Sequence, residues 1–248
     1  MKTIAIVAEK GGAAKTTTAL AISAALHDDG KRVLVVDLDR QRNSTMILAD
    51  NKTIGQYQNI TDALQGKGRS KPLAPCQNGF ILPSTAFLSE SSIKGLSDIK
   101  TILHAYSGDF DYCVIDCPPS LGALTIAALT AADFAIIPVK ADLFGYAAVT
   151  ETVKTIKAVQ GKANKGLRLL GVLPCMVNTR TRVGADFVAA LEELTKAYRC
   201  RLYPPIRQSA AIPEAQAMRA GNIFKYAPRA GATQDYRGFF EILKGDIE

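Results

Sequence analysis

The sequence lacks any long apolar run. Its 248 residues contain no stretch that approaches the roughly 20 apolar residues a membrane-spanning helix needs. It also lacks the apolar core of a signal peptide, because only a short strand-like run separates Lys2 from Glu9. We therefore expect a cytoplasmic protein with no membrane partner.

Cysteine is scarce and irregularly spaced. The five cysteines are odd in number and none forms a CxxC pair. Cys113 and Cys117 flank the end of a predicted strand, with no neighbouring His or Cys to complete a metal site. These absences favour buried thiols over a metal or cluster centre.

Internal repeats and low-complexity tracts are also absent. A hydrophobic fraction of 48% with 21% charged residues is typical of a globular protein. The formal net charge of +7 is compatible with a polyanionic partner. One domain spanning 1–248 is the prediction.

What is present is an alternation of apolar runs with helical patterns. Five runs resemble strands: TIAIVA, RVLVVDLD, DYCVIDCPP, FAIIPV and LRLLGVLPCMV. RVLVVDLD is followed by a polar segment, and each of the other four is followed by a helical pattern. Near-continuous Val, Ile and Leu strands separated by helices predict an α/β fold, with a mostly parallel twisted sheet covered by helices on both faces. Gly30 is predicted to end the first helix. The Gly-, Pro- and Lys-rich region around 50–90 is predicted to be a surface excursion, followed by a strand at FILPS and a helix around 90–105.

The stretch EKGGAAKTTT, directly after the first strand, has the context of a phosphate-binding loop. A helix start offers free N–H groups to an anion. Lys15 is predicted to contact the β- and γ-phosphates, Thr16 to bind Mg²⁺, and Thr17 to donate towards the α-phosphate. The loop departs from GxxxxGK[ST] at Glu9 and Ala14, where glycine would permit a positive φ.

A more specific pattern fits better. KGGAAKTTT resembles the deviant Walker A loop, KGGxGK[ST][TS], of the ParA/MinD ATPases. In that family the early lysine, here Lys10, reaches across a dimer to the partner's nucleotide, so the resemblance implies hydrolysis that depends on dimerisation. An exposed loop lysine is the alternative interpretation of Lys10.

Two further segments resemble the family's switch and Walker B motifs. DLDRQRN resembles D-x-D-P-Q-G-N, which implies that Asp39 positions Mg²⁺ and the attacking water, while Arg40 and Arg42 replace the usual Pro and Gly. DYCVIDCPPS resembles Walker B, which implies that Asp116 holds a Mg²⁺-bound water. Lys10, Lys15 and Asp39 are thus the predicted catalytic residues, and the predicted metal set is Thr16, Asp39 and Asp116.

The C-terminal third resembles the ParA blocks in order, so the likeness covers nearly the whole chain. In the family the base lies near residues matching Asn178 and Pro205. The implied nucleotide-binding set is Lys10, Gly11, Gly12, Ala13, Ala14, Lys15, Thr16, Thr17, Asn178 and Pro205.

The resemblance implies a short ParA-type partition ATPase: ATP and Mg²⁺ as cofactors, a homodimer in the ATP state, non-specific DNA binding on the nucleoid, and a ParB-like partner that stimulates hydrolysis. The acidic end DYRGFFEILKGDIE argues against a MinD-type membrane helix. With the first strand beginning at residue 3, no operator-binding domain is expected. The candidate DNA contacts are Arg180, Arg182, Arg207 and Arg219.

Two other functions stay open. Ala14, Arg40 and Arg42 are also compatible with an ATP-gated protein-binding regulator of the same fold that hydrolyses little or no ATP. A metabolic P-loop enzyme of the dethiobiotin-synthetase kind shares the fold, but Lys10 and the C-terminal blocks disfavour it.

Overall fold

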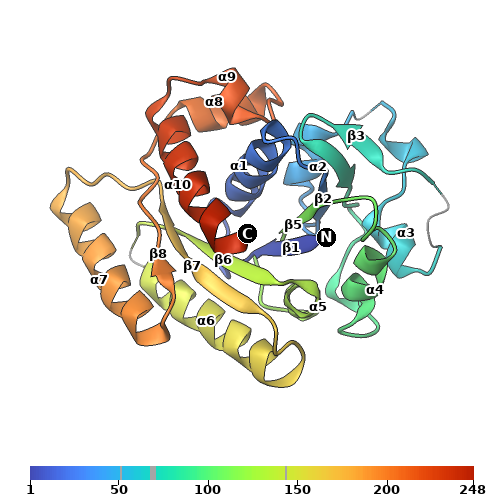
Figure 1. Ribbon diagram of the computed structural model, residues 1–248, viewed down its shortest axis with the longest axis horizontal. Coiled ribbons are helices and arrows are strands. Elements are labelled where there is room, and N and C mark those ends of the chain that lie inside the picture. The colour runs from blue at the N-terminus through green and yellow to red at the C-terminus, as the bar shows by residue number, and fades with distance from the viewer. Residues whose placement is uncertain (51, 68–70, 143) are drawn as a thin grey trace.

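The computed structural model describes residues 1–50, 52–67, 71–142 and 144–248, and the eight strands in these ranges form one sheet (Figure 1). They are β1 (Lys2–Ile6), β2 (Val33–Asp37), β3 (Ala74–Cys76), β4 (Gly79–Leu82), β5 (Tyr112–Asp116), β6 (Phe134–Lys140), β7 (Arg168–Cys175) and β8 (Arg201–Leu202). Their order is β3-β4-β2-β5-β1-β6-β7-β8, and only the β3–β4 pair is antiparallel. The predicted α/β class is confirmed.

The helices connect these strands on both faces of the sheet. They are α1 (Lys15–Asp28), α2 (Asn43–Leu48), α3 (Ile60–Leu64), α4 (Asp98–His104), α5 (Ala123–Ala131), α6 (Gly145–Lys162), α7 (Arg182–Tyr198), α8 (Ala211–Ala217), α9 (Ile223–Tyr226) and α10 (Gly231–Ile247), with 3₁₀ turns at Ile54–Gln56 and Glu90–Ser92.

Alternate residues of the central strand β1 enter two different cores. In β1, Ala5 packs with apolar side chains of α3 to α7, whereas Ile4 and Ile6 pack with those of α1 and α8 to α10. Figure 1 shows α1, α8 and α10 on one side of the sheet and α5, α6 and α7 on the other. Because both faces are buried, the central strands are apolar at nearly every position, as the sequence indicated.

The first helix has the termini that the sequence predicts. It begins at Lys15, directly after the loop, and ends at Asp28; Gly30 follows with φ 76°, the left-handed conformation typical of a residue just past a helix end. The far end of the chain returns to this region, because Lys2 Nζ donates to the carbonyl of Ile247 at 2.7 Å. The last helix is therefore tied to the central strand.

The region around 50–90 is more structured than predicted. The β3–β4 hairpin extends the sheet, and Ile60 and Leu64 of α3 are buried in the core. The helix expected around 90–105 is shorter, since a 3₁₀ turn at 90–92 precedes α4. Residues 51 and 68–70 of this predicted excursion lie outside the described residues.

None of the helices in the described ranges has the length and apolar character needed to cross a membrane.

The β7–β8 contact predicts a strong dependence on one glycine. A Cβ on Gly171 would overlap the carbonyl of Arg201 and lie 2.9 Å from the Tyr203 ring. We expect Gly171→Ala to lower the free energy of unfolding by about 2 kcal/mol or more, because the strands must separate to admit the methyl group. Gly161→Ala in α6, where a Cβ meets nothing within 4 Å, should instead stabilise by about 0.5–1 kcal/mol. Urea titrations measure both, and equal effects would contradict the packing argument.

Candidate functional site

The candidate site lies where the carboxyl ends of three central strands meet. Asp116 at the end of β5 is in register with Ile6 of β1 and with Asp37 of β2. The phosphate loop follows β1, and Asp39 follows β2. Parallel strands place such loops at one edge of the sheet, which is where ligands bind in open α/β folds.

The phosphate loop buries Lys15. This side chain is only 7% exposed, and its Nζ donates to the carbonyl of Lys10 at 3.0 Å. Burial lowers the pKa of Lys15, against the opposing attraction of Asp116 and Asp39. The ammonium group thus already lies inside the loop, with a backbone carbonyl as its hydrogen-bond partner.

The loop reaches this shape through two left-handed residues. Gly12 has φ 71° and Ala14 has φ 67°. Ala14 stands where the family pattern has glycine, so the sequence expectation of a position that favours positive φ is confirmed. A second such position is Arg42, with φ 60°, where the family pattern also has glycine. An L-residue in this conformation carries about 1–2 kcal/mol of strain.

Asp116 lies next to the phosphate loop and is almost fully buried. Its Oδ2 accepts hydrogen bonds from the hydroxyls of Thr16 at 2.8 Å and Ser44 at 2.7 Å. Its Oδ1 is buried and has no hydrogen-bond partner among the described residues. Burial raises the pKa of Asp116, although both hydroxyls and Lys15 oppose this.

Asp37, beside Asp116, is structural. It is fully buried, and its carboxylate accepts bonds from the backbone N–H of Asp39 and from the N–H and hydroxyl of Thr45. Burial, reinforced by the charge of Asp116, raises the pKa of Asp37. Asp37 therefore shapes the segment that carries Asp39, whose own carboxylate accepts from the N–H of Gln41 at 2.9 Å.

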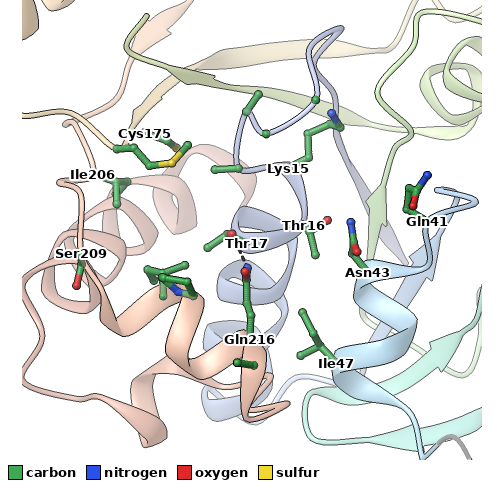
Figure 2. A pocket seen from close by; sticks show the side chains of 18 of the residues that line it. Lys15, Thr16, Thr17, Gln41, Asn43, Ile47, Cys175, Ile206, Ser209 and Gln216 are labelled. Carbon is green, nitrogen blue, oxygen red and sulfur yellow. Dashed lines mark hydrogen bonds between the residues drawn. The ribbon is translucent and has the colours of Figure 1, made fainter.

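A cavity of about 830 Å³ opens in front of the loop. Figure 2 shows Lys15, Thr16 and Thr17 on one wall, Asn43 and Ile47 of α2 on a second, and Cys175, Ile206 and Ser209 on a third. The predicted residues that line it are Gly11, Gly12, Ala13, Ala14, Lys15, Thr16, Thr17 and Asp39. The structure therefore brings most of the predicted nucleotide set together.

Asn178 and Pro205 line a second cavity, of about 710 Å³. Arg207 and Gln208 border both cavities. The two residues implied for the base are thus next to the phosphate cavity but do not line it.

Lys10 also lies outside the main cavity. Its Nζ forms an ion pair with Asp142 at 2.6 Å and lies 5.3 Å from the centre of the Phe144 ring. Both partners follow β6, and Phe144 is 65% exposed. The side chain of Lys10 is therefore held by Asp142 and Phe144 and does not line the main cavity of its own chain.

The donor set fits a magnesium nucleotide. Among the described residues no group of three His, Cys, Asp or Glu side chains could hold a metal by itself. Mg²⁺ commonly retains waters and binds through substrate phosphates with one or two protein ligands. Thr16, Asp39 and the unpaired Oδ1 of Asp116 suit such a shared site, and the cradle of loop N–H groups with Lys15 suits the phosphates.

The four candidate arginines differ in their surroundings. Arg207 forms a two-pronged pair with Asp235, with both contacts at 2.7 Å, so much of its hydrogen-bonding capacity is taken. Arg182 faces Asp186 at 3.7 Å on the exposed start of α7. Arg180 and Arg219 are exposed, with no ion pair among the described residues, and Arg219 borders the main cavity.

Sequence reasoning missed several residues of this site. Ser44, Thr45, Asp142 and Gln216 each bond a predicted residue or its neighbour. No motif identified them, and three of the four act through contacts between distant segments, whereas Thr45 bonds Asp37 eight residues away.

The fold and the loop define the class: a P-loop protein of the deviant Walker A type. The family model for an AAA domain matches residues 1–169. The chain belongs to the ParA/MinD-type partition ATPases, as the resemblance predicted.

Individual relatives support this placement. The sporulation initiation inhibitor protein Soj of Bacillus subtilis is 34% identical over 245 residues, covering 95% of each chain. Cobyrinic acid a,c-diamide synthase from Mycobacterium smegmatis, solved with an ATP analogue and magnesium, is 33% identical with a TM-score of 0.75, covering 90% of this chain and 92% of that one. An ATP complex of McdA from Cyanothece is 26% identical with a TM-score of 0.81, covering 98% and 96%.

The strain at Ala14 can be measured. We expect Ala14→Gly to stabilise the nucleotide-free protein by about 0.5–1 kcal/mol, because the relief of the left-handed strain exceeds the entropy that glycine adds to the unfolded chain. Ala13→Gly, at a buried neighbour outside the positive-φ residues, should destabilise. Chemical denaturation of both variants tests this, and a loss of stability in Ala14→Gly would contradict it.

Proposed function

We propose that this chain is an ATP-dependent partition switch, with one ATPase domain spanning 1–248. In this proposal Mg²⁺ and ATP bind at the phosphate loop, the ATP state dimerises, and the dimer binds DNA without sequence preference on the nucleoid. A ParB-like partner stimulates hydrolysis and releases the protein, which moves or positions plasmid, chromosome or other cargo. The observation that carries the proposal is the contrast between Lys15, buried inside the loop, and Lys10, turned away from it.

The nucleotide roles follow from the contacts. Lys15 would exchange the carbonyl of Lys10 for phosphate oxygens, a stronger, charge-assisted partner. Thr16 would turn its hydroxyl from Asp116 to the metal, and Asp39 would orient the attacking water. When bound, Mg²⁺ neutralises phosphate charge. Asn178 and Pro205 would contact the base from the second cavity.

In this proposal Lys10 acts on a second copy. Its ion pair with Asp142 is partly exposed, and such pairs contribute only about 1 kcal/mol or less, so a triphosphate offers a better partner. Reaching its own cavity would require leaving the half-buried Asp142 and the exposed Phe144. A lysine supplied by the partner would stabilise developing charge only in the dimer.

DNA binding is assigned to the exposed arginines. Arg180 and Arg182 follow the carboxyl end of β7, at the edge of the sheet that carries the nucleotide cavity, and Arg219, which follows α8, borders that cavity. Dimerisation would double this cationic surface, which links DNA binding to ATP. Arg207 is the weakest of the four candidates because of its pairing with Asp235.

Two alternatives keep specific support. Arg42 and Ala14 hold strained conformations where the family pattern has glycine, which suits a regulator that binds ATP and hydrolyses little. The structural likeness to a diamide synthase supports the other alternative, an enzyme that acts on a small molecule. ATP turnover stimulated by DNA and a partner protein, without any small substrate, separates the partition switch from both.

DNA binding should require ATP and should not depend on the DNA sequence, and its affinity should fall as the salt concentration rises. We expect anisotropy titrations on two unrelated duplexes to give equal affinities with ATP and no binding with ADP, because only the dimer joins two arginine sets. The log–log salt slope should be about −0.9 per phosphate neutralised. Binding that is independent of nucleotide, or confined to one duplex, would overturn the proposal.

Charge reversals supply the matched control. Arg180→Glu, Arg182→Glu and Arg219→Glu together should abolish DNA binding while ATP-driven dimerisation persists. Lys31→Glu, Lys162→Glu and Lys165→Glu change the charge equally at the opposite edge, before β2 and β7, and should change binding far less. Lys15→Ala, which removes the buried ammonium, should lose ATP binding and with it DNA binding.

Lys10 and Asp142 should have opposite effects. Lys10→Ala should leave ATP binding to the monomer nearly intact but weaken the ATP dimer and turnover. Asp142→Asn should tighten the dimer by about two- to fivefold, because it frees Lys10 from an ion pair of roughly 0.5–1 kcal/mol. Light scattering across a concentration series with a slowly hydrolysed ATP analogue measures both. A shift in the same direction for the two variants would contradict the role of Lys10 in trans.

A further inference from the structure

Helix α8 reaches the phosphate loop through one side chain. Gln216 Nε2 donates a hydrogen bond to Thr17 Oγ1 at 2.9 Å, across the main cavity wall. Figure 2 shows this bond between the first turn of α1 and the end of α8. The two residues are 199 positions apart, and no motif connects them.

The direction of this bond determines what Thr17 can do. A hydroxyl has one proton and two acceptor lone pairs, and Gln216 occupies a lone pair. The hydrogen bonds of the described residues give the Thr17 proton no acceptor. That proton is therefore available to an anion in the cavity, which Thr17 lines together with Lys15.

The turn that follows the same end of α8 is fixed to the β3–β4 hairpin. The side chain of Gln77 donates to the carbonyl of Arg219 at 3.1 Å and accepts from the N–H of Gly221 at 2.8 Å. Asn78, fully buried, donates to the carbonyls of Gly221 and Leu20. Arg219 itself is left-handed, with φ 53°. The turn at 218–221 is thus held by the hairpin, and the bond of the nearby Gln216 links it to Thr17 of the phosphate loop.

We propose that Gln216 is a positioning residue that turns the Thr17 hydroxyl toward the nucleotide phosphate and couples the Arg219 turn to nucleotide binding. The ligand is the phosphate chain of a nucleoside di- or triphosphate. Nucleotide binding strengthens the Thr17–Gln216 bond by polarising the hydroxyl, and this bond orders the end of α8. By linkage, ordering of the Arg219 turn raises nucleotide affinity by the same factor.

This inference rests on the proposed nucleotide site but not on DNA binding. If the wild-type protein binds neither ATP nor ADP, the proposed function fails. If the wild type binds nucleotide and the Gln216 variants bind it equally well, only the inference fails.

A double-mutant cycle on nucleotide affinity tests the role of Gln216. Gln216→Met keeps the length and removes the donor, and we expect it to raise the Kd of both ATP and ADP about 5- to 20-fold. Gln216→Glu should do more harm, because a carboxylate captures the Thr17 proton and repels the phosphate. In a Thr17→Ala background, Gln216→Met should change the Kd less than twofold, since its target is gone.

Controls separate positioning from packing. Gln65→Met makes the same exchange on an exposed residue after α3 and should leave the Kd unchanged. Thr17→Ser, which keeps the hydroxyl, should restore affinity relative to Thr17→Ala. Equal losses from Gln216→Met in both backgrounds would indicate packing alone and overturn the proposal.

Hydrogen exchange tests the coupling to the turn. The N–H groups of Ala220 and Gly221 are bonded to Ala215 and Gln77. We expect ADP to slow their exchange several-fold in the wild type and not in Gln216→Met at a saturating ADP concentration. If ADP does not change the exchange rate of these two N–H groups in the wild type, the proposed coupling is wrong.

Discussion

The charges buried around Asp116 are the constraint on which the rest of the site depends. Asp37 and Asp116 lie side by side in the sheet, and Lys15 is buried close to them. Burial disfavours every one of these charges, so it raises the pKa of both carboxyls and lowers that of the lysine. Thr16, Ser44 and Thr45 offset part of this cost with hydrogen bonds.

A ligand that carries both negative and positive charge would offset the free-energy cost of burying these three charged side chains. Phosphate oxygens would complete the surroundings of Lys15, and a divalent cation would complete those of the unpaired Oδ1 of Asp116. The same logic explains the strained backbone at Ala14 and Arg42: the loop and the start of α2 hold their shapes around the site although the residues themselves disfavour them.

The sequence predicts the fold and the phosphate loop well, because both depend on local signals. Apolar strands alternate with helices, and Lys15, Thr16 and Thr17 follow one strand directly. It predicts the region 50–90 less well, since Pro75 and the turn at 77–78 obscure a short hairpin that pairing with β2 and the contacts of Gln77 and Asn78 stabilise. It also misses Ser44, Asp142 and Gln216, whose partners lie 72, 132 and 199 residues away in the chain. Such contacts exist only once the sheet has brought the loops to one edge.

The two lysines of the phosphate loop show that the structure distinguishes side chains that the sequence motif treats alike. Both belong to the same short sequence, yet Lys15 turns inward to a backbone carbonyl and Lys10 turns outward to Asp142. The inward ammonium suits a phosphate bound to its own chain, whereas in the proposed function the outward one serves a second copy that docks at this edge. Since Phe144 lies exposed beside Lys10, a copy that docks here would cover an apolar ring and receive a cation at the same place. Nucleotide binding and self-association would then meet on one surface, and Thr17, held by Gln216, would connect that surface to α8 on the other side of the cavity.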